Sequence, residues 1–148
     1  MNIELTNLTN FSMDEETLKS LANFALKKLG IHPDSELSIS LVDEDEMSSL
    51  HMRWLNETGP TDVLSFPMDE LKPESAVNGP GILGDIVLCP KFAEAQAKNA
   101  GQTLEKEIEL LMVHGVLHLL GFDHRESDEK TIMFSQQDEI LREWRSRP

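Results

Sequence analysis

Three histidines stand close together in the last third of the chain, at His114, His118 and His124. Residues four apart on an α-helix lie on one face, one turn apart, so His114 and His118 can point their imidazoles toward the same ion. Gly121 can adopt the left-handed conformation that ends a helix, so that the chain turns back and brings His124 close. Because imidazole nitrogen is a preferred ligand of zinc, this spacing predicts a metal site.

The number of histidines indicates what kind of metal site to expect. Structural zinc sites surround the ion with four protein ligands, whereas catalytic sites use three and leave the fourth position to water or substrate. A single histidine on an apolar helix is more often a packed core residue, but this chain has only five histidines and three lie within eleven residues. We therefore expect one zinc ion in an open, catalytic site formed by His114, His118 and His124.

The same spacing of histidines and glycine occurs in the metzincin proteases, whose pattern is His-Glu-x-x-His-x-x-Gly-x-x-His. In those enzymes the glutamate after the first histidine is the general base for the attacking water. Here that position is Gly115, which has no side chain. Peptide hydrolysis needs a base and later an acid, so the sequence disfavours a protease.

Three sequence blocks together resemble one family of bacterial proteins. The blocks are Pro60–Pro67 (PTDVLSFP), Leu83–Val87 (LGDIV) and the histidine segment 114–124. In this order and at similar separations they resemble the blocks of the YbeY family of metal-dependent endoribonucleases. The resemblance implies an endoribonuclease specific for single strands that acts on ribosomal RNA precursors, in ribosomal RNA processing and maturation and in ribosome quality control. It also implies a ribosomal or assembly-factor protein as partner.

Further polar residues in or near these blocks are candidates for the site. The family places an arginine a few residues before the Pro-Thr pair, and the candidate here is Arg53, seven positions before Pro60. Its guanidinium is a candidate to bind two phosphate oxygens at once. An equally good alternative is that Arg53 is a solvent-exposed helix residue without a role in the site. Asp85 is a candidate base or a residue that supports the ligands. Asp123 can accept the second ring nitrogen of a histidine or bond its own backbone in a turn.

The sequence is also compatible with two other functions. A metalloprotease-like or other zinc hydrolase would share the histidines but would need its glutamate from elsewhere in the chain. A noncatalytic, metal-stabilised ribosome-assembly module would need a fourth ligand, for which Asp123 or His51 is the candidate. His51 lies on the apolar face of a predicted helix, so we expect it to be packed or hydrogen-bonded instead.

The charge of the chain constrains any role with RNA. There are 27 acidic and 13 basic residues, which gives a net charge of −14, whereas polyanions are normally bound by basic surfaces. Residues 1–50 hold ten of the acids and only three lysines, so part of the excess is local. We expect weak binding to naked RNA, with a protein partner supplying much of the affinity.

The length and composition predict one domain spanning residues 1–148. The N-terminus lacks a basic segment followed by an apolar run, and the longest apolar stretches are short, so we expect a cytoplasmic protein without a membrane partner. The single cysteine, Cys89, is expected to be a core residue at a strand end.

The pattern of apolar residues predicts alternating strands and helices around the histidines. Strands are expected around Ile3 and Leu5 and at 36–41, 62–66 and 82–88. Helices are expected after a capping box of Ser12 and Glu15 as far as Gly30, after Asp43, from Pro90 to Ala97, from Thr103 and after Ser127. The polar loop 67–81 is expected to border the cleft. These elements predict an α+β fold, with a mixed sheet of about four strands and the zincin-like metal helix innermost.

Overall fold

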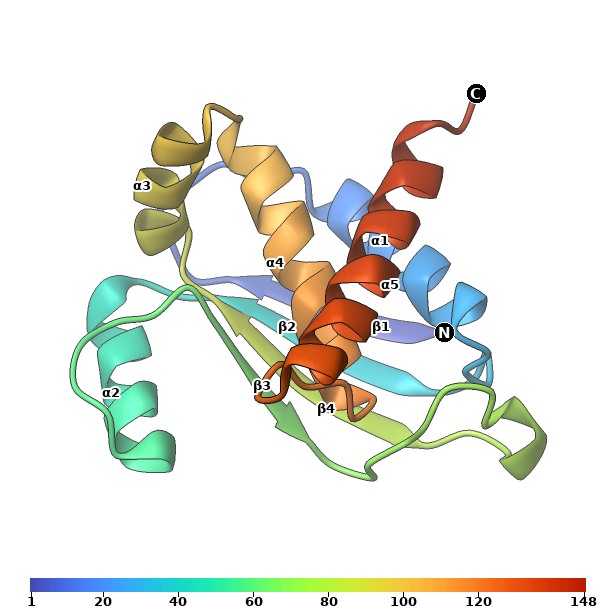
Figure 1. The fold of residues 1–148 in the computed structure, drawn as a ribbon. Helices are drawn as coiled ribbons and strands as arrows, with labels where there is room; N and C mark the ends of the chain where they lie inside the picture. Colours follow the sequence, from blue (N-terminus) through green and yellow to red (C-terminus); the bar gives the residue numbers. More distant parts are fainter.

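The protein folds as an α+β structure in which a four-stranded mixed sheet is packed with five α-helices (Figure 1). A computed structural model describes all 148 residues. The elements in chain order are β1 (Asn2–Asn7), α1 (Glu15–Lys28), β2 (Glu36–Leu41), α2 (Glu44–Leu55), β3 (Val63–Pro67), the 3₁₀ turn η1 (Ala76–Asn78), β4 (Ile82–Leu88), α3 (Pro90–Ala100), α4 (Leu104–Leu119) and α5 (Ser127–Arg145). The predicted fold class is confirmed.

The sheet has the order β1-β2-β4-β3. Strands β1, β2 and β4 run parallel, and β3 pairs antiparallel with β4 at one edge. Helix α1 connects β1 to β2, as the crossover between neighbouring parallel strands requires. The edge strand β3 is therefore the strand whose residues lie next to both α4 and the loop that leaves α2.

One face of the sheet packs against helices and forms the main core. Alternating residues of β2 and β4 point into the core that the helices cover, and none of the following is more than 2% exposed: Leu37, Ile39, Leu41, Ile86 and Leu88. Helix α4 contacts β3, β4, α1, α3 and α5. Because α4 is buried on nearly every side, its apolar residues hold it in one position, as predicted for the innermost helix.

Helix α4 lies in close contact with the sheet at Gly115. A Cβ atom built on Gly115 would lie 3.0 Å from Cγ2 of Ile86 and 3.1 Å from Oγ of Ser65. The Ser65 hydroxyl also donates a hydrogen bond to the Gly115 carbonyl oxygen at 3.2 Å. The absence of a side chain at this position therefore has a structural cause, which is the close contact between helix and sheet.

The opposite face of the sheet is partly covered by α2, which Figure 1 shows apart from the other helices. A small apolar cluster of five buried residues joins them: Val42, Met47, Leu64, Val87 and Cys89. Cys89 is fully buried at the end of β4, as expected. Helix α2 thereby lies beside the strand that carries the Pro-Thr block.

Two helix starts differ from the prediction. Helix α1 is capped by Asp14, whose carboxylate accepts hydrogen bonds from the backbone N and the hydroxyl of Thr17, so Ser12 lies outside the helix. Helix α5 is capped by Glu126, which forms a capping box with Glu129. Both carboxylates lie one residue before the helix and displace the serine as the cap.

The prediction that the loop 67–81 borders the cleft is wrong. Of this loop, only Pro67 is among the residues that line the groove of the histidines. The loop instead packs against the end of α1. The backbone N of Glu74 donates to Leu29 O at 2.9 Å, and the backbone N of Ala76 donates to Gly30 O at 2.9 Å. These bonds fix residues 74–76 of the loop to the end of α1.

The close approach at Gly115 gives a stability prediction. Replacing Gly115→Glu, which restores the metzincin pattern, forces a charged side chain between α4 and the sheet and should cost about 3 kcal/mol or more. Urea unfolding measures the loss, and Ser135→Glu, which adds the same charge to an exposed position of α5, is the matched control. Equal stability of the two variants would contradict the packing argument.

Candidate metal centre

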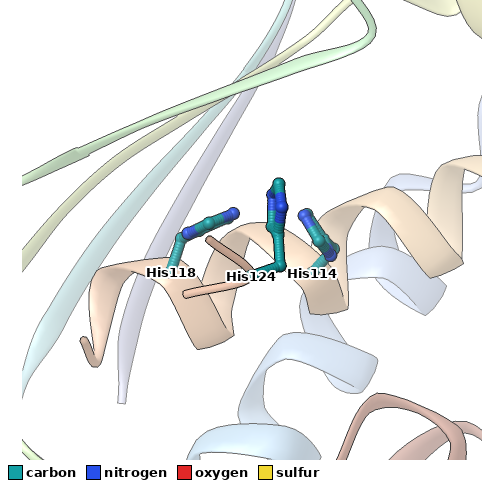
Figure 2. Close-up of side chains that lie close together, drawn as sticks. All are labelled: His114, His118 and His124. Atoms are coloured by element: carbon teal, nitrogen blue, oxygen red, sulfur yellow. The ribbon is translucent and has the colours of Figure 1, made fainter. Parts of the chain in front are cut away.

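The three histidines lie together at the end of α4 (Figure 2). His114 and His118 occupy successive turns of the helix, as their spacing predicts. After Leu120, Gly121 takes a φ of 94°, and the backbone N of Phe122 donates to Leu117 O at 3.0 Å. This left-handed turn brings His124 beside the other two.

The arrangement of the rings suits a divalent metal ion. One nitrogen from each of the three imidazoles lies within 4.8 Å of the others. The ring centroids are 4.7 Å apart for His114 and His118, 5.2 Å for His118 and His124, and 5.5 Å for His114 and His124. Imidazole nitrogens that converge in this way fit the requirements of zinc and similar cations.

The orientation of the His114 ring is fixed by Gln137 of α5. Nδ1 of His114 lies 2.9 Å from Oε1 of Gln137, so Nδ1–H donates and the lone pair remains on Nε2. Gln137 is only 4% exposed and occupies the apolar face of α5 between Met133 and Ile140. A buried acceptor behind a ligand histidine is the usual way in which a protein sets the ligating tautomer.

Burial also keeps the imidazoles in the neutral form that a metal needs. Desolvation is the main cause that lowers the pKa of His118 to about 4 from the ordinary 6.5, with the neighbouring His114 and His124 acting in the same direction. The pKa of His114 is lowered as well, again chiefly by desolvation. At neutral pH both rings therefore hold a free lone pair.

The histidines open into a groove of about 590 Å³. One wall consists of β3 and the chain before it, and α2 supplies further residues, among them His51, Trp54 and Leu55. The segment 123–125 completes the lining. The cluster is thus accessible to a substrate of some length.

Asp123 behaves as a turn aspartate and does not support a histidine ring. Its Oδ1 accepts from the backbone N of His124 at 2.7 Å, and its Oδ2 lies 3.2 Å from Nε of Arg125. These contacts, led by the backbone hydrogen bond, lower the pKa of the carboxyl. Of the two alternatives for Asp123, the turn is the one that the structure contains.

The structure does not bring Arg53 or Asp85 to the histidines. Arg53 lies on the exposed side of α2, where Nη2 donates to Oγ of Ser49 at 3.4 Å, and it does not line the groove. Asp85 projects from the opposite face of β4 to Ile86 and lines a separate hollow with Glu4 and Glu36. The arginine that does line the groove is Arg125.

His51 lines the groove but is occupied by protein partners. Its Nδ1 lies 3.0 Å from Gly59 O, and its Nε2 lies 2.8 Å from Oε2 of Glu57. The ring is 9% exposed and ties the loop after α2 to the helix. This is the packed, hydrogen-bonded role expected for His51.

Sequence reasoning missed three residues of this site: Gln137, Arg125 and Trp54. Gln137 carried a usable signal, because a glutamine inside an otherwise apolar helix face needs a buried partner. Arg125 and Trp54 carried none, since their place in the groove depends on how α2 and the turn after α4 pack together.

The fold and the site define a small α+β protein with a three-histidine cluster consistent with a metal site. The model of the family described as "Endoribonuclease YbeY" matches residues 3–145. The chain belongs to this family, a family of RNA-cleaving hydrolases by its name.

Individual relatives agree over almost the whole chain. The endoribonuclease YbeY of Thermobifida fusca is 54% identical over 147 residues, covering 98% of this chain and 95% of the relative. The endoribonuclease YbeY of Nocardia farcinica is 53% identical, covering 97% and 80%. The solution structure of TM1509 from Thermotoga maritima matches with a TM-score of 0.66 and 32% identity, covering 99% of this chain and 93% of that one.

The role of Gln137 can be tested by metal affinity. Gln137→Leu removes the acceptor that orients His114 and should weaken zinc binding about 10- to 100-fold. Competition with a chromogenic chelator measures the affinity, and Gln137→Glu, which keeps an acceptor, should retain it. Gln136→Leu on the same helix is the matched control. Wild-type affinity in Gln137→Leu would contradict the assignment.

The lowered pKa of His118 predicts how the metal-free protein responds to acid. Between pH 6.5 and about 4 the unfolded chain binds a proton on this residue and the folded chain does not, so stability falls as the pH drops through this window. His118→Gln removes the site and should flatten this part of the curve. Urea unfolding across the pH range, with chelator present, makes the comparison. Identical slopes for the variant and the wild type would contradict it.

Proposed function

We propose that this protein is a metal-dependent endoribonuclease, specific for single-stranded RNA, that acts on ribosomal RNA precursors in ribosomal RNA processing and maturation and in ribosome quality control. The observation that carries the proposal is the convergence of His114, His118 and His124 at the floor of an open groove, in a chain of the endoribonuclease YbeY family. We propose zinc as the ion.

The residues of the site favour phosphodiester chemistry. A zinc ion bound there would supply a Lewis acid, which stabilises negative charge on phosphate oxygens. Neutral imidazoles leave the charge of such an ion uncompensated, so the site would attract an anion. Gln137 would hold the His114 ring in its ligating orientation. Arg125, 86% exposed at its side chain and partly occupied by Asp123, is the cation that lines the groove and can reach a phosphate.

A protease or related zinc hydrolase is less well supported. The carboxylates that line the groove are Asp62 and Asp123. Asp62 accepts from the backbone N of Val63 at 2.7 Å and from Nε2 of Gln96 at 3.2 Å, and Asp123 is held in its turn. No carboxylate follows His114, since Gly115 is packed against the sheet. The general base of the metzincin proteases therefore has no counterpart here.

A noncatalytic assembly module is also less well supported. Such a module would close the fourth metal position with a side chain. The cluster that can hold an ion consists of the three histidines alone, and His51 and Asp123 are engaged elsewhere. An open position is what an enzyme needs.

The proposal includes a protein partner and a cytoplasmic location. With a net charge of −14, the chain gains little general attraction for RNA, so a ribosomal or assembly-factor protein would supply much of the affinity. None of the helices has the length and apolar character needed to cross a lipid bilayer.

Cleavage of RNA by the zinc-loaded protein tests the proposal. We expect a ribosomal RNA fragment with unpaired regions to be cut, and His114→Ala and chelated wild type to lose the activity by at least about a hundredfold, because both remove the ion. A denaturing gel resolves the products, and a peptide substrate is the control for protease activity. The proposal would be contradicted if the protein bound zinc but cut no RNA, either alone or when ribosomal subunits were added.

The same assay compares the two arginines. Arg125→Ala should reduce cleavage by about tenfold or more if its guanidinium contacts a phosphate. Arg53→Ala tests the prediction made from the sequence, and a loss confined to Arg53→Ala would mean that α2 moves when RNA binds.

A further inference from the structure

Trp54 is exposed although it is one of the largest apolar side chains of the protein. It is 62% exposed at the end of α2, whereas the other tryptophan, Trp144, is 8% exposed and packs on Phe24. Asn56, with a left-handed φ of 55°, ends the helix just after Trp54. The indole therefore stands in solvent on a well-defined helix end.

A second aromatic ring orients Trp54. Phe66 of β3 lies edge-on to it, with ring centroids 6.1 Å apart and an angle of 61° between the planes. Such edge-to-face contacts fix the relative orientation of two rings. The pair thus joins α2 to β3 across the side of the groove.

Trp54 and Phe66 are both among the residues that line the groove containing the three histidines and Arg125. The groove therefore combines groups suited to a phosphate with uncharged aromatic surface. A nucleotide has the same combination, a phosphate and a flat base. Aromatic side chains bind bases of any sequence by stacking.

The negative charge of the protein makes stacking on Trp54 more important for RNA binding. A chain with a net charge of −14 cannot draw much affinity from neutralising phosphates across its surface. Stacking on Trp54 needs no positive charge. It also requires a base whose face is free, which excludes bases inside a duplex.

We propose that Trp54, oriented by Phe66, is a stacking platform for an unpaired nucleobase of the RNA strand that enters the histidine groove. This inference rests on the proposed function and adds to it the residue that recognises an unpaired base.

Binding of a single-stranded RNA dodecamer, measured with chelator present so that no cleavage occurs, tests the platform. Fluorescence anisotropy should show binding weakened about tenfold or more in Trp54→Ala, with most affinity kept in Trp54→Phe. Met52→Ala is the matched control, because Met52 is exposed on the same helix but does not line the groove. The deficit of Trp54→Ala should be similar at low and high salt.

A dodecamer that keeps its phosphates but carries abasic positions completes the test. The wild type should lose affinity when the stacked base is removed, and Trp54→Ala should not distinguish the two strands. In a Trp144→Phe background, Trp54 is the sole tryptophan, and its fluorescence should be quenched by the intact strand only. Equal binding by wild type and Trp54→Ala would overturn the platform.

The two proposals fail in different ways. RNA cleavage by the zinc-loaded wild type, with a KM unchanged in Trp54→Ala, would leave the endoribonuclease intact and overturn the platform. Base-dependent quenching of Trp54 without cleavage would support the platform and overturn the endoribonuclease. A Trp54 that responds to a ribosomal protein but not to RNA would overturn the platform and indicate a protein-docking surface.

Discussion

The contact between α4 and the sheet at Gly115 is the constraint on which the rest of the site depends. The helix lies so close to Ile86 and Ser65 that a Cβ atom at this position would force these side chains to shift. This closeness fixes the rotation of α4 about its own axis, because any turn of the helix would carry a larger residue into the gap. His114 and His118 consequently face the groove, and the residue between helix and sheet cannot also be a general base.

Helix α5 positions the residue that orients the His114 ring of α4. Its apolar residues Met133, Ile140 and Leu141 belong to the main core, so the helix is held against α4 by burial. Gln137 lies among them and places one polar atom behind His114. The carbonyl of this amide accepts from Nδ1–H of the histidine, which leaves Nε2 for a ligand. The packing of the apolar face of α5 against the core thus determines which nitrogen of the His114 ring carries the proton.

Local patterns explain which parts of this structure could be predicted from the sequence. The strand 36–41 alternates strictly between apolar and polar residues, and the helix of His114 and His118 follows from a four-residue spacing, so both were confirmed. The sequence predicts caps at Ser12 and Ser127, whereas the caps are Asp14 and Glu126, because a serine and a nearby carboxylate offer similar signals. Only the conformation of the chain decides between them.

Parts of the site that depend on distant segments could not be predicted. Arg53 is the nearest arginine in sequence to the Pro-Thr block, yet the rotation of α2 directs it to solvent and directs Trp54 to the groove. Asp85 follows a glycine in β4, and the alternation of the strand places it on the face away from α4. Sequence distance carries no information about which face of an element meets another element.

The acidity of the chain and the aromatic surface of the groove have one consequence in common. A duplex presents phosphates on the outside and covers its bases, so an acidic protein would be repelled by the phosphates without any compensating contact. An unpaired strand presents the same phosphates together with free base faces, for which Trp54 offers a partner. In the proposed function, the net negative charge therefore favours unpaired strands over duplexes, because binding is favourable only where a base can stack and a phosphate can reach the histidine cluster.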